Sequence, residues 1–166
     1  MGHYTIAFIV DAENREDAKA VVEDLFNGGD DYSFWDVTGF DYGKVLDGDA
    51  GDPDVPRVVP IDSVEGRALL QELLRDMKAT WVHYAKQIYR KMRQARSRGV
   101  SFERMWEHYT ENQMRYAARQ LGSYGGPSIL IYEEHGGGLA NEVELCQHLA
   151  NASGETRFVV PADVHY

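Results

Sequence analysis

Residues 4–10 read YTIAFIV, a continuous apolar run that is rich in β-branched and aromatic side chains. Residues 128–134, SILIYEE, form a second run of the same kind. Runs of this length and composition are typical of strands that other elements cover. We therefore expect the two segments to be the adjacent central strands of one antiparallel sheet.

Two further segments have a strand-like composition that suits the edges of that sheet. Residues 32–42, YSFWDVTGFDY, are aromatic and β-branched with interspersed aspartates, and residues 156–164, TRFVVPADV, contain Pro161. Because proline cannot donate a ladder hydrogen bond, Pro161 indicates an edge strand or a bulge. We expect one of these strands at each edge.

Short helices are predicted after the first and third strands. Asn14 is suited to cap the first helix, because its side chain can accept the free amide hydrogens of the first turn. Apolar residues then recur at helical spacing as far as Phe26. The last helix is expected over about 139–149, with Cys146 buried on its apolar face as a structural thiol.

A helical hairpin is predicted in the middle of the chain. Ser63 is suited to cap a helix from about 63 to 98, in which apolar residues recur every three or four positions. A second helix should follow from Ser101 to about 121. Because only a few residues separate the two helices, we expect them to be antiparallel.

The order of elements predicts the fold class. Without the hairpin it is the βαββαβ order of a ferredoxin-like sandwich. We predict an α+β fold, namely a ferredoxin-like βαββαβ sandwich with a long helical hairpin inserted between strands 2 and 3. The sandwich would comprise residues 1–62 and 123–166, and the inserted hairpin residues 63–122. The rival interpretation is a helical protein with a small mixed sheet beside it.

Composition restricts the classes of partner. The chain has 166 residues, of which 43% are hydrophobic, and a net charge of −10. Such a surface does not as a whole attract nucleic acid or an anionic membrane, so we expect neither a duplex nucleic acid partner nor a membrane. A single cysteine and the lack of a signal peptide predict a cytoplasmic protein.

Three segments within residues 4–62 carry a family resemblance: YTIAFIVDAENREDAKAVVEDL, FWDVTGFDYGKVLDGD and VVPID. They resemble a class of small uncharacterised α+β proteins encoded by bacteriophages, chiefly those of actinobacteria. In that class the second segment usually carries a Gly-Gly-Arg-Trp core, where this chain has Thr38-Gly39-Phe40-Asp41. The resemblance implies a phage origin, and hence a host cytoplasm, but no chemistry, because the class has no assigned activity.

A glycine-rich stretch joins the third strand to the last helix. Glycines let a backbone approach a ligand closely, and the free amides at a helix start favour an anion. The Lys and Ser/Thr of a phosphate-binding loop are missing. The hypothesis is a ligand site, for example for a nucleotide, and the alternative is a flexible turn. The candidate residues are Glu133, Glu134, His135, Gly136, Gly137 and Gly138.

A metal or acid–base site is a second hypothesis. In a ferredoxin-like sheet the end of the third strand lies beside the start of the first and near the end of the fourth. This arrangement would gather His3, His135, Asp163 and His165, which are residue types that bind metals or transfer protons. The alternative is that these side chains point to opposite faces of the sheet. The sequence does not identify a cofactor.

A basic cluster around the predicted hairpin tip is the third candidate. Concentrated positive charge on an acidic protein can attract an acidic partner protein. The alternative is a solvated helix end, where cations complement the helix dipole. The predicted partner-binding residues are Lys86, Arg90, Lys91, Arg93, Arg96, Arg98 and Arg104.

The aromatic residues of the hairpin bear on its assembly. Trp81, Tyr84, Tyr89, Trp106, Tyr109 and Tyr116 stand at helical spacing, which is typical of a core. The hairpin has more large apolar side chains than one neighbouring helix can bury. We therefore expect a homo-oligomer.

Three functions are compatible with these observations. The first is a non-enzymatic accessory protein of phage type that binds a host or defence protein. The second is a protein that binds or sequesters a small ligand such as a nucleotide. The third is a metal-dependent hydrolase or nuclease that uses the edge rich in histidine and carboxylate. We favour the first because of the segregated charge and the phage resemblance.

Overall fold

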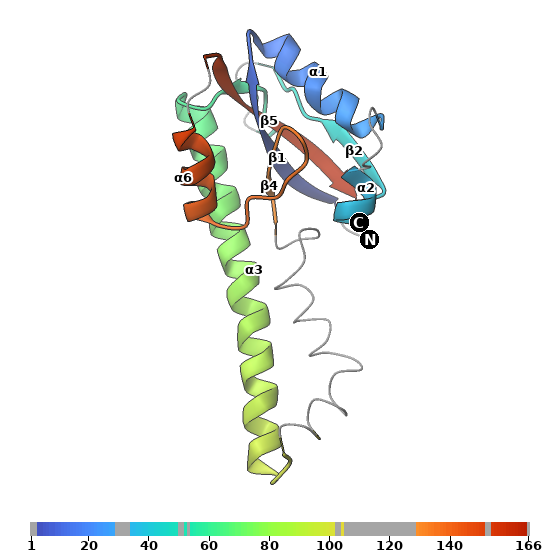
Figure 1. Ribbon diagram of the computed structural model, residues 1–166, viewed down its shortest axis with the longest axis vertical. Coiled ribbons are helices and arrows are strands. Elements are labelled where there is room, and N and C mark those ends of the chain that lie inside the picture. Colours follow the sequence, from blue (N-terminus) through green and yellow to red (C-terminus); the bar gives the residue numbers. More distant parts are fainter. Residues whose placement is uncertain are drawn as a thin grey trace.

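The computed structural model describes residues 3–28, 34–49, 52, 54–101, 104, 129–151 and 154–165. Within them, the strands form one five-stranded sheet, with helices packed around it (Figure 1). Its strands are β1 (His3–Ala12), β2 (Tyr42–Val45), β3 (Val59–Pro60), β4 (Ile131–Glu133) and β5 (Thr156–His165). The order is β2-β5-β1-β4, and β3 pairs with the same edge of β5 as β2.

The two apolar runs pair with each other, as predicted, but the pairing is parallel and not antiparallel. Ala7 of β1 lies opposite Ile131 of β4 in a parallel ladder. The middle of the sheet is formed by β1 and β5, which pair antiparallel from His3↔His165 to Ala12↔Thr156. The ferredoxin-like order and the all-antiparallel sheet are therefore wrong. Apolar content identified a buried strand, but the composition of a strand is the same whichever way the strand runs.

Pro161 lies inside the central strand β5, and the expectation of an edge strand there is wrong. Its carbonyl accepts a hydrogen bond from the Leu46 amide at 2.8 Å, so the backbone of Pro161 faces the edge that β2 and β3 share. The ladder of β2 ends at Val45↔Ala162, and that of β3 begins at Val59↔Val159. The missing N–H therefore falls in the gap between two short strands, where no ladder bond is lost.

The segment predicted as a strand over 32–42 contains a helix instead. Helix α2 covers Phe34–Thr38 and ends at Gly39, whose φ is 76°. The Thr38 hydroxyl donates to the Phe34 carbonyl at 2.7 Å, which satisfies a buried polar group within one turn. Phe34 packs on Phe8 and Tyr132 with ring centroids 5.4 and 5.3 Å apart. Burial of these aromatic rings outweighs the β propensity of the segment.

Helices cover both faces of the sheet. Figure 1 shows α1 (Arg15–Phe26) and α2 on one side, and α3 (Val64–Ser97) and α6 (Glu142–Ala150) on the other. The β1 residues Ile6 to Val10 are consequently at most 1% exposed. The structure is thus a mixed α+β fold with a three-layer arrangement, not a sandwich with one helical layer.

Capping residues begin the helices where the sequence predicts. The Asn14 side chain accepts from the Asp17 amide at 3.0 Å, and the Ser63 hydroxyl accepts from the Gly66 amide at 3.0 Å. Helix α3 then runs for 34 residues, which confirms the long helix predicted over 63–98. Most of the second helix of the hairpin, predicted over 101–121, lies outside the described residues. None of the described helices is both long and apolar enough to span a membrane.

Candidate functional site

Helix α3 has two halves with different surroundings. Leu70, Leu73 and Met77 in its first half belong to the same buried core as the sheet. The second half extends beyond the sheet (Figure 1), and there Trp81 is 54% and Tyr89 62% exposed. The expectation that these two aromatic residues form a core is therefore wrong. Trp106, Tyr109 and Tyr116 lie outside the described residues.

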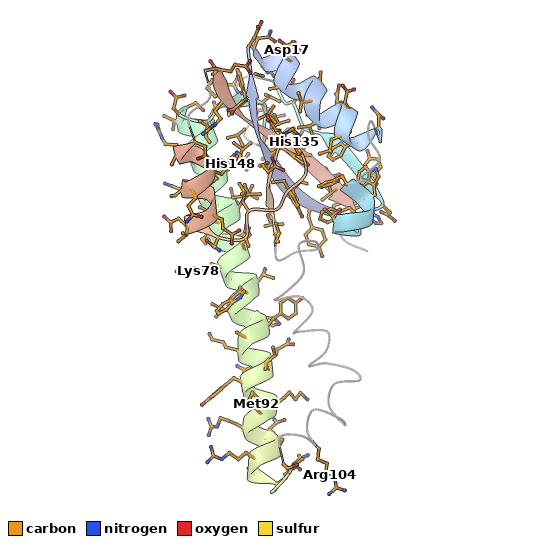
Figure 2. All side chains as sticks on the ribbon, in the orientation of Figure 1. Asp17, Lys78, Met92, Arg104, His135 and His148 are labelled. Carbon is orange, nitrogen blue, oxygen red and sulfur yellow. The ribbon has the colours of Figure 1, made fainter. Side chains whose placement is uncertain are left out.

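The extending half of α3 has basic residues and no acidic ones. No Asp or Glu occurs between Asp76 and Glu103. Figure 2 labels Lys78 near the sheet end of this stretch, Met92 farther along, and Arg104 at the far end. Arg90, Arg93 and Arg96 are exposed, as the position of the apolar stripe predicts.

We call the seven predicted partner-binding residues the basic tip. All are exposed except Lys91, which is half-buried. Within the described part of the chain, their side chains form no ion pair. The basic tip consists of Lys86, Arg90, Lys91, Arg93, Arg96, Arg98 and Arg104.

An acidic cleft lies at the other end of α3, and the sequence analysis missed it. It has a volume of about 750 Å³ and lies between the start of β1, the 47–57 loop and the first half of α3. Val55, Pro56 and Leu69, which are half-buried, supply apolar surface. Six carboxylates line the cleft: Asp49, Asp52, Asp54, Glu65, Glu72 and Asp76.

Two arginines offset part of this negative charge, whereas Asp49, Asp52 and Asp54 form no ion pair with a described residue. Arg57 also lines the cleft and donates to both oxygens of Glu65 at 2.9 Å. Arg75 reaches Glu72 and Asp76 at 3.7 Å. The spacing of seven and four between Glu65, Glu72 and Asp76 places them on one helix face. That spacing, together with the acidic 47–54 stretch, is the signal that could have revealed the cleft.

The glycine-rich stretch forms a closed turn. The chain folds back after β4, so that Tyr132 bridges to Gly138 and the Leu139 amide donates to the Ile131 carbonyl at 2.8 Å. The Gly136 amide donates to the Glu133 carbonyl at 2.9 Å. The Gly137 amide donates to the Glu133 carboxylate at 2.8 Å. Two amides that an anion would need are thus bonded within the turn.

The backbone amides at the start of α6 are also hydrogen-bonded within the chain. The Asn141 side chain accepts from the Val143 and Glu144 amides at 3.0 and 3.1 Å. The Glu144 carboxylate accepts from the Ala140 amide at 2.8 Å. An incoming anion would have to displace these acceptors, one of which is itself negative. The Glu134 carboxylate accepts a 3.2 Å hydrogen bond from the Asp11 amide.

Only three of the four predicted metal ligands come together. His3 Nδ1 lies 2.9 Å from Asp163 Oδ2, and the His3 and His165 rings have centroids 5.2 Å apart. His165 Nδ1 in turn lies 2.6 Å from Asp41 Oδ1. This arrangement is two adjacent His–Asp pairs. Among the described residues, no group of three His, Cys, Asp or Glu side chains is placed to hold a metal ion.

His135 lies elsewhere, which corrects the predicted constellation. Because β4 runs parallel to β1, its end at Glu133 pairs with Ile9, not with the start of β1. Glu133, two residues before His135, is therefore about 20 Å along the sheet from His3, at about 3.3 Å per residue. The His135 side chain is 82% exposed and lies 3.6 Å from Glu134.

A second unpredicted feature joins the sheet to α6. Arg157 Nε donates to Asp11 Oδ1 at 2.6 Å, and Nη1 donates to the Leu149 carbonyl at 2.9 Å. The Asp11 carboxylate raises the pKa of Arg157. Because the guanidinium satisfies carbonyls at the C-terminal end of α6, its role is structural. Cys146 on α6 is exposed, so the expectation of a buried thiol is wrong.

The comparison with known families covers nearly the whole chain. Residues 2–166 match the family described as Domain of unknown function (DUF7995), and the chain belongs to that family. No curated protein and no solved structure is significantly similar to it.

Proposed function

We propose that this protein is a non-enzymatic binding protein that presents the extending half of α3 to an acidic partner protein. The single observation that carries the proposal is the exposure of aromatic and basic side chains on that half of the helix. It extends beyond the sheet and exposes Trp81 and Tyr89, and its cations form no ion pair with any residue that the structure describes. Exposed aromatic and arginine side chains are the residue types that contribute most of the energy of protein interfaces.

The separation of the basic tip from the acidic rest of the chain favours a partner protein with an acidic groove over a duplex nucleic acid. Six of the 17 Lys and Arg residues lie within residues 86–98, whereas the whole chain contains 27 Asp and Glu. A long polyanion that follows the basic tip would also meet the acidic body. An acidic groove that receives only the end of the helix avoids this repulsion.

The resemblance of residues 4–62 to bacteriophage proteins supports a host or defence protein as that partner, met in the host cytoplasm. The two alternative functions have less structural support. Nucleotide binding at 133–138 must compete with the internal bonds of the turn. Metal-dependent hydrolysis would require His135 beside His3, where the structure does not place it.

Site-specific photo-cross-linking tests this proposal. A photoreactive residue at Tyr89 should cross-link a partner, whereas one at Val143 on α6, which is 64% exposed, should not. The partner is then purified, and its dissociation constant is measured with the full chain. Equal labelling from both positions would contradict the proposal.

Two double variants, one at the basic tip and one outside it, give a matched comparison. Arg93→Glu/Arg96→Glu should weaken binding on the order of a hundredfold if two close charge pairs are replaced by repulsion. Lys44→Glu/Arg67→Glu makes the same change in net charge on exposed residues of β2 and of the first half of α3 and should leave binding near the wild-type value. Equal losses in both variants would show that only net charge matters.

A further inference from the structure

We propose that copies of this chain associate head to tail, with the basic tip of one copy docked in the acidic cleft of the next. The two surfaces are complementary in charge. The cleft has six carboxylates and one arginine among its lining residues. The stretch from Met77 to Phe102 has no acid at all.

The surfaces also match in their apolar parts. The half-buried Val55, Pro56 and Leu69 line the cleft together with the carboxylates. On the extending half of α3, Tyr89 is 62% and Met92 39% exposed beside the arginines. A cleft of about 750 Å³ accommodates a few large side chains, not a whole domain. The end of a single helix therefore suits it as a ligand.

A chain cannot dock its own basic tip in its own cleft. Both surfaces include residues of α3, which is one continuous helix from Val64 to Ser97. Asp76 at the cleft and Arg93 at the tip are 17 positions apart, or about 26 Å at 1.5 Å per residue. A helix does not fold back on itself, so only a second copy can bring the two surfaces together.

This contact joins two different surfaces, and that determines the kind of assembly. After one contact forms, the first copy still has a free cleft and the second a free tip. Such heterologous contacts add further copies unless the rotation closes a ring. Growth beyond two copies, not a symmetric dimer, is therefore expected.

Sedimentation of the full chain tests the first part of the proposal. At about 0.01 M salt, where the Debye length is about 30 Å, the mass should rise with concentration beyond two copies. At about 1 M salt, where the Debye length is about 3 Å, the mass should fall to that of the monomer. A monomer at both salt concentrations would overturn the proposal, and so would a mass that stops at two copies or ignores salt.

A mixing experiment tests which surfaces meet. Glu72→Gln/Asp76→Asn removes two charges from the cleft, and Arg93→Glu/Arg96→Glu reverses two at the tip. Each variant alone should associate on the order of tenfold more weakly than the wild type. Mixed in equal amounts they should form pairs that stop at two copies, because one supplies the intact tip and the other the intact cleft.

Sedimentation of a control variant and of the mixture shows whether the proposal holds. Glu16→Gln/Asp24→Asn makes the charge change of the cleft variant on exposed positions of α1 and should associate like the wild type. A mixture of cleft and tip variants that stays monomeric at low salt overturns the proposal. Circular dichroism melts confirm that each variant is folded.

The proposal uses the same basic tip as the proposed function but does not require the partner protein. Self-association would compete with the partner for the tip. The cleft variant should therefore bind the partner at least as tightly as the wild type. If no acidic partner binds the basic tip although the wild-type chain still self-associates, the result counts against the proposed function alone.

Discussion

Arg157 and Asp11 form a two-point ion pair across the β1–β5 ladder, with Nε–Oδ1 and Nη2–Oδ2 distances of 2.6 and 3.2 Å. The two residues are register partners, and their side chains are only 13% and 23% exposed. The same guanidinium donates to carbonyls at the end of α6. One side chain thus ties the central strand pair to a helix.

Replacing Arg157 should therefore destabilise the protein strongly. Arg157→Ala removes the two-point partner of a largely buried carboxylate and leaves α6 carbonyls unsatisfied, which should cost about 3 kcal/mol of unfolding free energy. Arg57→Ala is the matched control, because Arg57 also binds a carboxylate at two points but the Glu65 side chain is 56% exposed. That change should cost no more than about 1 kcal/mol. Urea unfolding gives both values, and equal costs would contradict the structural role of Arg157.

The arginines of the basic tip should be nearly irrelevant to stability. Arg90, Arg93 and Arg96 are exposed on the extending half of α3. Changing all three to Glu should alter the unfolding free energy by about 0.5 kcal/mol per site, with some further loss from the reversed helix dipole. Binding of the acidic partner should be abolished in the same variant. Wild-type affinity in the triple variant would reduce the basic tip to a solvated helix end.

Tyr132 should make stability fall at alkaline pH. Burial raises the pKa of its phenol above the ordinary value of 10.0. Above about pH 10 the unfolded chain therefore loses this proton while the folded chain keeps it, so unfolding becomes easier by up to about 1.4 kcal/mol per pH unit. Tyr132→Phe removes this contribution, at the cost of the 3.2 Å hydrogen bond to the Ile129 carbonyl.

The measurement is the difference between two stability curves. Unfolding free energies of the wild type and Tyr132→Phe, followed from pH 8 to about 11, should converge above about pH 10. Tyr89→Phe, which removes an exposed hydroxyl, serves as the control. Parallel curves for wild type and Tyr132→Phe would show that the phenol titrates alike in both states.

Gly136 should not tolerate a side chain. Its φ is 85°, and a Cβ there would approach Phe34 Cδ2 to 3.1 Å. Gly136→Ala should cost about 1–2 kcal/mol from the left-handed backbone, plus the displacement of Phe34. Gly28 is the matched control, since its φ is 77° but a Cβ would meet no atom within 4 Å. If Gly28→Ala costs as much in a thermal melt, the contact with Phe34 contributes nothing.

Local signals in the sequence predicted several elements well. Asn14 and Ser63 begin helices because a side-chain acceptor at that position satisfies free amides, which is a property of a few neighbouring residues. The strand-forming runs within 4–10 and 128–134 were recognisable because the apolar content of a short segment is likewise a local property. The basic tip could be read from composition alone, because an acid-free stretch of a helix remains basic in any fold.

Features that depend on residues far apart in the chain were missed or wrong. The sequence of 34–38 favours a strand, yet burial of Phe34 against Phe8 and Tyr132 makes it a helix. The acidic cleft joins carboxylates from the 47–57 loop to those of α3. Nothing local to either segment specifies their meeting.

By itself, then, the sequence determined which segments are buried, where the capped helices begin and where positive charge is concentrated. Only the tertiary structure decided that β4 runs parallel to β1 and that β5 lies in the middle of the sheet. The physical reason is that apolar content and propensity are unchanged when a strand is reversed, whereas direction and order depend on which faces the helices cover. That single reversal separates His135 from His3.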